Sequence, residues 1–342
     1  MISKARRFPA SPPEVEEVLP GLWSIPVPIP ISPLRYVLTY ALELESGGFM
    51  LVDSGWDAQE ALEGLEAGLA KAGATLADVR GVAVTHIHPD HYGLAGRVRE
   101  VSGAWLALHP ADAALIATRY GDVDELLAQV AAWLRGAGTP EAEVEPLTRS
   151  SMEIREFVAV APPTLLLGDG DPVDAPGWDI VTIHTPGHSP GHVCFHERRT
   201  GVVFTGDHVL PHITPNISVH PQSGSDPLGA YLASLERMLV LGAVPALPGH
   251  EQRFPDLAAR VRELLDHHEH QLEQVLELVA AGAETTWEVA ERFPWSRSWD
   301  RITGFIRRAA IGETHAHLVV LERRGLVVRE GDQPLRWRPA SS

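Results

Sequence analysis

Seven histidine and aspartate side chains occur in an order that points to a pair of metal ions. They are His86, His88, Asp90, His91, His188, Asp207 and His250, and the first four lie within six consecutive residues. Imidazole nitrogens and carboxylate oxygens bind zinc and its neighbours in the transition series, and a catalytic site keeps one position open for water. Three imidazoles suit one ion, an Asp and two imidazoles suit another, and one carboxylate can lie between them. The pattern therefore predicts a dinuclear metal site and metal-assisted hydrolysis.

The predicted ligands are expected on loops that follow strands. Short apolar runs precede all of them, at residues 81–84, 179–183, 201–205 and 244–247. Alternation along an extended segment places His86, His88 and Asp90 on one side, and a turn into a helix brings His91 towards the same centre. Because loops at the ends of strands can converge on one cleft, we expect the seven side chains to meet there. The chain has 17 histidines, so the spacing, and not the residue type alone, supports this site.

The same residues resemble the metallo-β-lactamase-fold hydrolase superfamily. The resemblance rests on Leu51-Val-Asp-Ser-Gly55, Thr85-His-Ile-His-Pro-Asp-His91, Thr185-Pro-Gly-His-Ser-Pro-Gly-His192, Thr205-Gly-Asp-His208 and Pro248-Gly-His250, and it extends over about residues 20–265. The most similar branches are lactamase-like protein 2 and the hydroxyacylglutathione hydrolases. The resemblance implies an α/β fold, the αββα sandwich, with the metal site at one edge of two packed sheets.

The resemblance also implies a role for each position. It implies that His86, His88 and His188 surround the first metal, that Asp90, His91 and His250 surround the second, and that Asp207 bridges the two. Asp53 is implied as a carboxylate that orients the ligating imidazoles, since such partners fix a ring's tautomer. The sequence departs from many relatives at Glu251, where they have Gly, and this departure concerns the pocket and not the metals.

Length and composition predict one large catalytic domain and a small second one. A single core stops growing near about 250–300 residues, and the chain has 342, so we expect a catalytic domain over 1–265 and a second domain over 266–342. No apolar run is long enough for a membrane helix. The basic start lacks an apolar segment after it, so a secretory signal is not expected and a cytoplasmic setting is. The single cysteine, Cys194, is expected to be buried.

Residues 111–160 are predicted to be a helical insertion. The run 122–134 has helical periodicity, and long connections in compact domains are usually functional. Extra scaffold is one interpretation, and a lid or wall over the metal cleft is the other. In the second case Leu127, Trp133 and Leu134 would line an apolar substrate pocket.

The chain after His250 predicts a long helix over 257–281, a helix capped at Thr285 or Thr286, a helix near 304–310 and a final hairpin. This order resembles the winged-helix-like module appended in lactamase-like protein 2 relatives. His267, His268 and His270 are expected on the solvated face of the long helix and not at a third metal. Residues 297–342 contain nine Arg and five acidic residues, whereas the whole chain has a net charge of −17. This overall charge disfavours a nucleic-acid partner.

We expect attack by a metal-bridging hydroxide on a carboxylic ester of the thioester or lactone kind. Asp90 and Asp207 are the predicted catalytic carboxylates, and Asp90 can pass a proton to the leaving group. His212 and Asn216 are candidate substrate-binding residues because they follow Asp207 closely. The alternative is a metal-dependent endoribonuclease that acts on single-stranded RNA.

The expected cofactors are two divalent metal ions, with zinc first and manganese or iron as alternatives, because an oxygen- and imidazole-rich set does not separate them. The expected partner is a small-molecule substrate, with no membrane. The oligomeric state is open, and a homodimer is one alternative.

Overall fold

The computed structural model describes residues 12–30, 34–150 and 152–340. The start of the chain, for which no secretory signal is expected, therefore falls mostly outside the described residues. The larger sheet has seven strands in sequential order: β1 (Glu16–Leu19), β2 (Leu22–Pro28), β3 (Tyr36–Glu43), β4 (Phe49–Val52), β5 (Val79–Ala83), β6 (Trp105–Leu108) and β7 (Leu165–Leu166). Strands β1 to β4 pair antiparallel, and β4 to β7 pair parallel.

The second sheet has the order β11-β10-β9-β8. Its strands are β8 (Ile180–His184), β9 (Val193–Glu197), β10 (Val203–Gly206) and β11 (Ala246–Pro248). Strands β8, β9 and β10 pair antiparallel, and β10 pairs parallel with β11. The carboxyl ends of β10 and β11 therefore lie at the same edge of this sheet.

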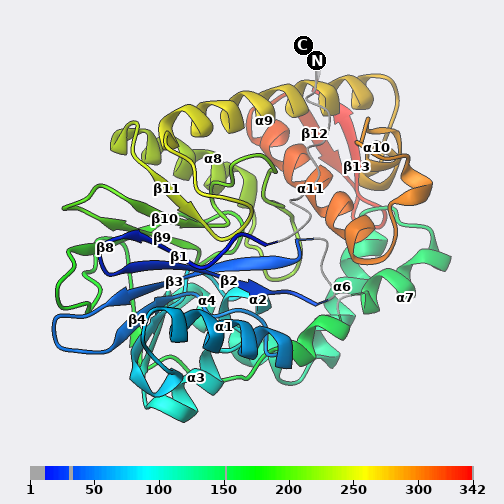
Figure 1. Cartoon of the computed structure of the whole chain (residues 1–342). Coiled ribbons are helices and arrows are strands. Elements are labelled where there is room, and N and C mark those ends of the chain that lie inside the picture. The colour runs from blue at the N-terminus through cyan, green and yellow to red at the C-terminus, as the bar shows by residue number, and fades with distance from the viewer. Residues whose placement is uncertain (1–11, 31–33, 151, 341–342) are drawn as a thin grey trace.

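Alternating side chains along the strands separate the two faces of each sheet. In β4, Met50 and Val52 pack against the second sheet, whereas Phe49 and Leu51 pack against helices. In β9, Cys194 lies on the helix side, fully buried as predicted. A strand's side chains point to opposite faces with a period of two, so each sheet has one face for its partner sheet and one for helices. Figure 1 shows the resulting αββα sandwich, which confirms the expected fold class.

Helices cover both outer faces. Those on the larger sheet include α1 (Gln59–Lys71) and α3 (Ala95–Ser102), and those on the second sheet include α8 (Pro227–Met238) and α9 (Leu257–Ala280). The turn α2 (Pro89–Tyr92) begins within the predicted metal motif, with Pro89 at its first position, where a missing N–H costs nothing. No helix in the described ranges is long and apolar enough to cross a membrane.

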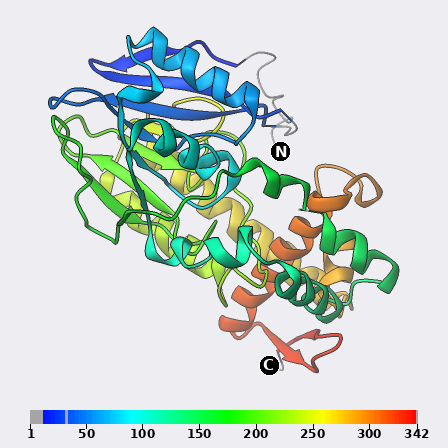
Figure 2. The same cartoon turned by 90° about the horizontal axis from the view of Figure 1, so that it is seen from below.

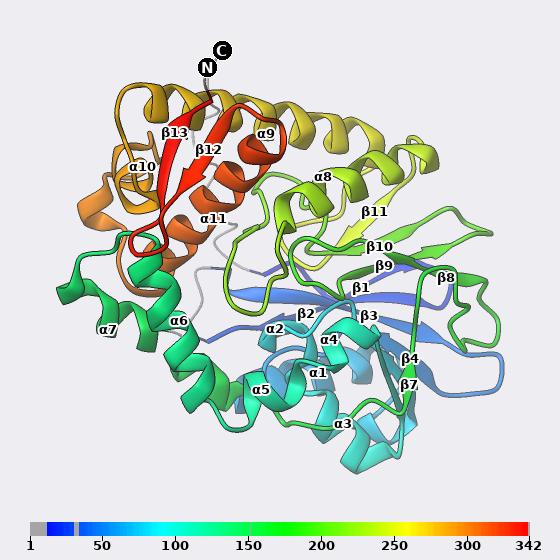
Figure 3. The same cartoon turned by 180° about the vertical axis from the view of Figure 1, so that it is seen from behind.

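The insertion and the end of the chain pack against each other. The insertion forms α4 (Pro110–Ala113), α5 (Ile116–Tyr120), α6 (Asp124–Gly136) and α7 (Glu141–Arg149), and the end of the chain forms α10 (Thr286–Arg292), α11 (Gly304–Arg323) and the hairpin β12 (Val327–Glu330) with β13 (Arg336–Pro339). Leu134 and Leu147 share a buried cluster with Trp287 and Ile311. Figures 2 and 3 show α6 and α7 beside the carboxyl-terminal helices. The insertion is thus anchored to the end of the chain.

The carboxyl-terminal helical region is confirmed, with two corrections. The helix predicted near 304–310 continues to Arg323, since residues 311–321 are almost all buried. His268 is also buried, at 1% exposure, and its Nδ1 lies 3.3 Å from Nε2 of His317. The expectation of a solvated position was wrong for His268 because α11 covers that face of α9. The cap at Thr285 is present as a capping box. The winged-helix assignment stays a prediction, as does the division into 1–265 and 266–342, whose boundary lies inside α9.

A half-buried carboxyl group in α11 predicts a pH dependence of stability. Burial raises the pKa of Glu313 to about 7, although the side-chain amide of Gln271 lies 3.4 Å away. A carboxyl group with a raised folded-state pKa contributes stability below its unfolded pKa, and this contribution is lost as the pH rises towards 7. We expect the free energy of unfolding of the wild type to fall by up to about 3 kcal/mol between pH 4.5 and 8, relative to Glu313→Gln. Urea unfolding of both proteins across this range measures the difference, and parallel curves would contradict it.

Candidate metal centre

The four loops that carry the predicted ligands meet at one edge of the sandwich. The His86–His91 segment follows β5, His188 follows β8, Asp207 follows β10 directly, and His250 follows β11 after one glycine. Parallel pairing of β10 with β11 places two of these ends side by side. The sheets pack face to face, so the ends of β5 and β10 are also brought together. The structure thus unites all seven side chains, as the sequence predicts.

Three imidazoles form the first group able to hold a metal ion. Nδ1 of His88 lies 2.9 Å from Nε2 of His86 and 2.9 Å from Nε2 of His188. The other ring nitrogen of His188 lies 2.9 Å from the carbonyl oxygen of Asn216, and Nδ1 of His86 lies 3.1 Å from the Thr85 hydroxyl. The nitrogens of His86, His88 and His188 that face one another are thereby left to bind a cation.

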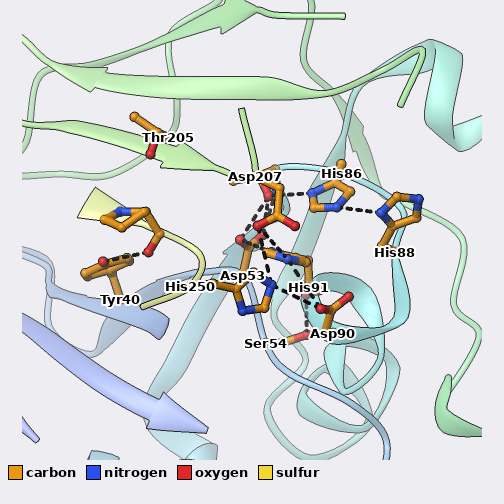
Figure 4. A network of polar contacts seen from close by, with 12 residues as sticks. Tyr40, Asp53, Ser54, His86, His88, Asp90, His91, Thr205, Asp207 and His250 are labelled. Atoms are coloured by element: carbon orange, nitrogen blue, oxygen red, sulfur yellow. Dashed lines mark hydrogen bonds and ion pairs between the residues drawn. The ribbon is translucent and has the colours of Figure 1, made fainter. Parts of the chain in front are cut away.

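A second group consists of Asp90, His91 and His250, with Asp207 between it and the first (Figure 4). Nε2 of His250 lies 3.2 Å from a carboxylate oxygen of Asp90 and 3.4 Å from one of Asp207. The opposite oxygen of Asp207 lies 3.6 Å from Nε2 of His188. Because its two oxygens face different groups of imidazoles, Asp207 has the position of a bridging carboxylate.

Asp53 fixes the orientation of the His91 ring. Its carboxylate lies 2.7 Å from Nδ1 of His91 and accepts hydrogen bonds from the backbone and hydroxyl groups of Thr85. Nδ1 of His250 is held in the same way by the carbonyl oxygen of Tyr36, at 3.0 Å. A donor role for Nδ1 leaves Nε2 as the lone-pair nitrogen that points into the site.

The electrostatics of the site suit a cation. Burial, with the nearby imidazoles of His91 and His88, holds the pKa of His86 well below its usual value, so this ring is neutral and able to ligate. Burial would raise the pKa of Asp207, but the charges of His250 and His91 hold it well below its usual value. Burial opposes protonation of His250, yet Asp207 raises its pKa to about 10. The carboxylates thus attract positive charge into a buried place.

Unsatisfied polar atoms test whether a metal pair fits. Nε2 of His91, Nε2 of His250 and Oδ1 of Asp207 are buried without a hydrogen-bond partner in the part of the chain that the structure describes. Such atoms are costly in a folded protein unless they bind something. All three point into the predicted site, so these residues fit two divalent cations.

Two residues that support the site were given no role from the sequence. Asp112 is fully buried, and its carboxylate accepts hydrogen bonds from the backbone N–H groups of Ile87 and Gly191 and from the Ser189 hydroxyl, at 2.6 to 2.9 Å. It therefore ties the first ligand loop to the loop of His188. His192 is also buried and lies between the Thr185 hydroxyl and the backbone N–H of Asp207. Its position four residues after His188 was the available signal, whereas Asp112 has no motif of its own.

A cavity begins at the first group of imidazoles. His88 and His188 line it together with residues from the insertion and from α11. Of the residues predicted to line a pocket, Asn216, Leu127 and Trp133 do so. Leu134 does not, because it is fully buried in the cluster between the insertion and the end of the chain.

His212 is also absent from the cavity lining in the described chain. Its ring lies 3.5 Å from the Glu251 carboxylate, which accepts hydrogen bonds from the backbone N–H groups of His212 and Ile213. Glu251 has a φ of 66°, in the region that favours glycine. The hydrogen bonds to residues 212 and 213 offset that strain, so Glu251 holds this loop and keeps His212 away from the cavity.

Comparisons with known proteins agree with this geometry. The family described as "Metallo-beta-lactamase superfamily" matches residues 33–250. A crystal structure of a metallo-beta-lactamase family protein from Thermus thermophilus superposes with a TM-score of 0.80 at 33% identity, covering 94% of this chain and all of that one. The probable metallo-hydrolase YqjP of Bacillus subtilis is 26% identical over 87% of this chain and 91% of its own length.

Two further relatives match shorter segments. The human acyl-coenzyme A thioesterase MBLAC2 is 32% identical over 50% of this chain and 55% of its own length. The lactamase-like protein adaB of Aspergillus niger is 36% identical over 108 residues, and the chain spans about a third of the length of such fungal relatives. Because the family match includes every predicted ligand and the fold agrees over nearly the whole chain, this chain belongs to the metallo-β-lactamase superfamily, whose members are metal-dependent hydrolases.

Proposed function

We propose that the protein is a dinuclear-metal hydrolase that cleaves an acyl thioester. The observation that carries this proposal is the cavity, which starts at His88 and His188 and continues along the apolar residues of α6. Leu126, Leu127 and Val130 form an apolar surface beside the predicted metals. An acyl chain can lie on this surface while its carbonyl group reaches the imidazoles.

Two observations favour a thioester over the other substrates. The human relative is named an acyl-coenzyme A thioesterase, and the apolar wall suits an extended acyl chain better than a compact lactone ring. Single-stranded RNA stacks its bases on exposed aromatic rings. Within the described chain, three Tyr, Trp or Phe side chains line the cavity: Tyr120, Trp133 and Phe305. Trp133 already donates its N–H to His315. This small set of rings favours a thioester over single-stranded RNA.

The seven predicted ligands would hold two divalent cations, with zinc the first candidate. Such ions supply a water of lowered pKa and polarise a carbonyl group. Asp207 lies between the two groups of ligands and keeps them in register, and Asp53 and the Tyr36 carbonyl fix the two rings of the second group.

Asp90 is the residue best placed to move a proton. Its side chain is 16% exposed, whereas those of His91 and His250 are fully buried, so Asp90 reaches towards solvent. In hydrolysis the C–S bond breaks, the acyl carbon gains the oxygen of water, and the thiolate needs a proton. Asp90 can accept the proton that the water loses and deliver it to the departing sulfur.

A comparison of three substrates tests the proposal. We expect metal-reconstituted protein to hydrolyse a hexanoyl thioester with a higher kcat/KM than a lactone or single-stranded RNA. His88→Ala provides the blank that removes contaminating activity. Metal-dependent RNA cleavage above thioester hydrolysis would replace the proposal with the endoribonuclease alternative, and a preference for the lactone would keep the carbonyl chemistry but change the substrate.

A further inference from the structure

The cavity next to the metal centre has a charge opposite to that of the chain. The chain has a net charge of −17. The cavity is nevertheless lined by Arg119, Arg155 and Arg308, and none of the described residues that line it is an Asp or a Glu. Three guanidinium groups around one cavity repel one another, so their presence there needs a reason.

These arginines are not occupied by acidic partners. Among the side chains that the structure describes, no carboxylate lies within ion-pair distance of any of the three, although many other arginines of the chain have one. Arg155 donates to the carbonyl oxygens of Arg119 and Gly121 at 2.9 and 2.7 Å, which is a structural role. Arg308 donates through one nitrogen to the carbonyl oxygens of Leu147 and Thr148, at 3.3 and 3.2 Å. A guanidinium has five N–H donors, so Arg308 keeps donors for another partner.

The neighbouring residue in α11 shows the contrast. Arg307 lies 3.1 Å from the Glu143 carboxylate and over the ring of Trp299. The charge of Arg307 is thus paired with a carboxylate, and this ion pair joins α11 to the insertion. Arg308 lies one residue further, lines the cavity and lies over the ring of Phe305, but it has no carboxylate partner among the described side chains.

Burial makes the unpaired charge costly. Burial, and then the charge of Arg119, lowers the pKa of Arg308 to about 10, so the guanidinium remains charged at neutral pH. A half-buried charge without a carboxylate partner costs stability, and that cost falls when an anion enters the cavity. Both side chains line the cavity and have no carboxylate partner among the described side chains, so an anion in the cavity would stabilise them.

Their position places that ligand beside the reaction. The hydroxyl of Tyr120 donates to the carbonyl oxygen of Ile87 at 2.6 Å, which anchors the end of α5 to the loop between His86 and His88. Arg119 precedes Tyr120, and both line the cavity with His88. An anionic group held by Arg119 would therefore lie in the same cavity as a carbonyl group at the predicted metals.

We propose that Arg119 and Arg308 form an anion-binding subsite, and that the substrate of this hydrolase carries a carboxylate or phosphate on the same molecule as its acyl group. This inference rests on the proposed function and narrows its substrate class. The apolar residues of α6 bind the acyl chain, and the two guanidinium groups bind the anion with charge-assisted hydrogen bonds. Neutral esters and neutral lactones are accordingly poor substrates.

A binding experiment separates this inference from the hydrolytic activity. The first probe is 3-(hexylthio)propanoate, a thioether that cannot be hydrolysed, and the second is its neutral methyl ester. Calorimetry on the full chain, with and without bound metal, measures the affinity of both probes. We expect the carboxylate probe to bind about 10- to 100-fold more tightly than the ester in either state, as charge-assisted hydrogen bonds to an arginine predict.

The variants assign the preference to particular residues. Arg308→Gln and Arg119→Gln are expected to remove most of the preference each, and Arg308→Lys to retain part of it because the charge remains. Arg262→Gln is the matched control, since Arg262 is exposed on α9 and does not line the cavity. If Arg308→Gln fails to fold, Arg119→Gln and the comparison of the two probes on the wild type still test the subsite.

Kinetics then distinguish the two anions. S-hexanoyl phosphopantetheine is compared with S-hexanoyl pantetheine, and S-hexanoyl 3-mercaptopropanoate with its methyl ester. The pair with the larger ratio of kcat/KM identifies phosphate or carboxylate as the anion. Equal binding of the two thioether probes would overturn the subsite. It would also be overturned if the preference for the carboxylate probe survived both glutamine variants and disappeared when the metal was removed. If no thioester is hydrolysed but the carboxylate probe binds through Arg119 and Arg308, the subsite stands and the proposed function fails.

Discussion

His88→Ala is expected to lower kcat/KM by about 10³-fold or more, because a catalytic metal contributes several kcal/mol of transition-state stabilisation. Nδ1 of His88 lies 2.9 Å from a nitrogen of His86 and from one of His188, so it occupies the centre of the first group. Alanine leaves two imidazoles, which is too few for a site that must also keep a position open. Elemental analysis of dialysed protein should show fewer than the two metal ions per chain expected for the wild type.

The matched control is His270→Ala. His270 is exposed on α9, and its loss should change neither the metal content nor the rate. The unfolding temperature of His88→Ala without metal should remain close to that of the metal-free wild type, since the imidazole is partly exposed. A His88→Ala protein that keeps both metals and full activity would contradict the predicted ligand set.

Asp112→Ala is expected to have the largest effect among residues outside the predicted ligand set. The change leaves the buried N–H groups of Ile87 and Gly191 and the Ser189 hydroxyl without their acceptor. Each unsatisfied buried group costs about 1–3 kcal/mol, so the loss of three acceptor contacts should lower the free energy of unfolding by about 3 kcal/mol or more. The two ligand loops also lose their shared anchor, and partners of this kind are typically worth about 10- to 100-fold in metal affinity or activity.

Urea unfolding and metal titration measure the two effects separately. Asp179→Ala is the control, because Asp179 forms an exposed ion pair with Arg198 and such pairs contribute at most about 1 kcal/mol. If Asp112→Ala lost stability but kept its metal affinity, Asp112 would support the fold and not the geometry of the site.

The convergence of the seven predicted ligands could be predicted from sequence because it depends on local features. Each predicted ligand follows a short apolar run, and the end of a buried strand is where a polar side chain can face a cleft. The H-x-H-x-D-H spacing brings four side chains to one turn, whatever surrounds it. Asp53 was also predicted, because it belongs to a short motif after β4.

The supporting residues could not be predicted in the same way. Asp112 lies in the first turn of α4, where an Asp is ordinarily exposed. Its burial depends on β6 and the loop of His188 meeting from opposite sheets. His268 was expected to be solvated because polar residues surround it in sequence, and α11, about 50 residues further along, covers it.

In the pocket, too, some positions could be predicted from local sequence and others depend on packing. Leu127 and Trp133 were predicted to line it because they lie in an amphipathic helix, but Leu134 lies in the same helix and faces the core instead. One residue of rotation separates the two faces of a helix, so a prediction of the lining needs the packing partner. His212 was expected in the pocket from its short distance in sequence to Asp207, yet the Glu251 carboxylate holds that loop elsewhere.

The sequence by itself determined the strands, the motif and therefore the family and the kind of metal chemistry, because periodicity and spacing are properties of neighbouring residues. Only the tertiary structure decided what surrounds that chemistry. Arg119 comes from the insertion and Arg308 from α11, 189 positions apart, and neither has a recognisable motif. They meet at one cavity because the insertion packs against the end of the chain. Long-range packing of this kind is set by the free energy of the whole fold, and no local pattern records it.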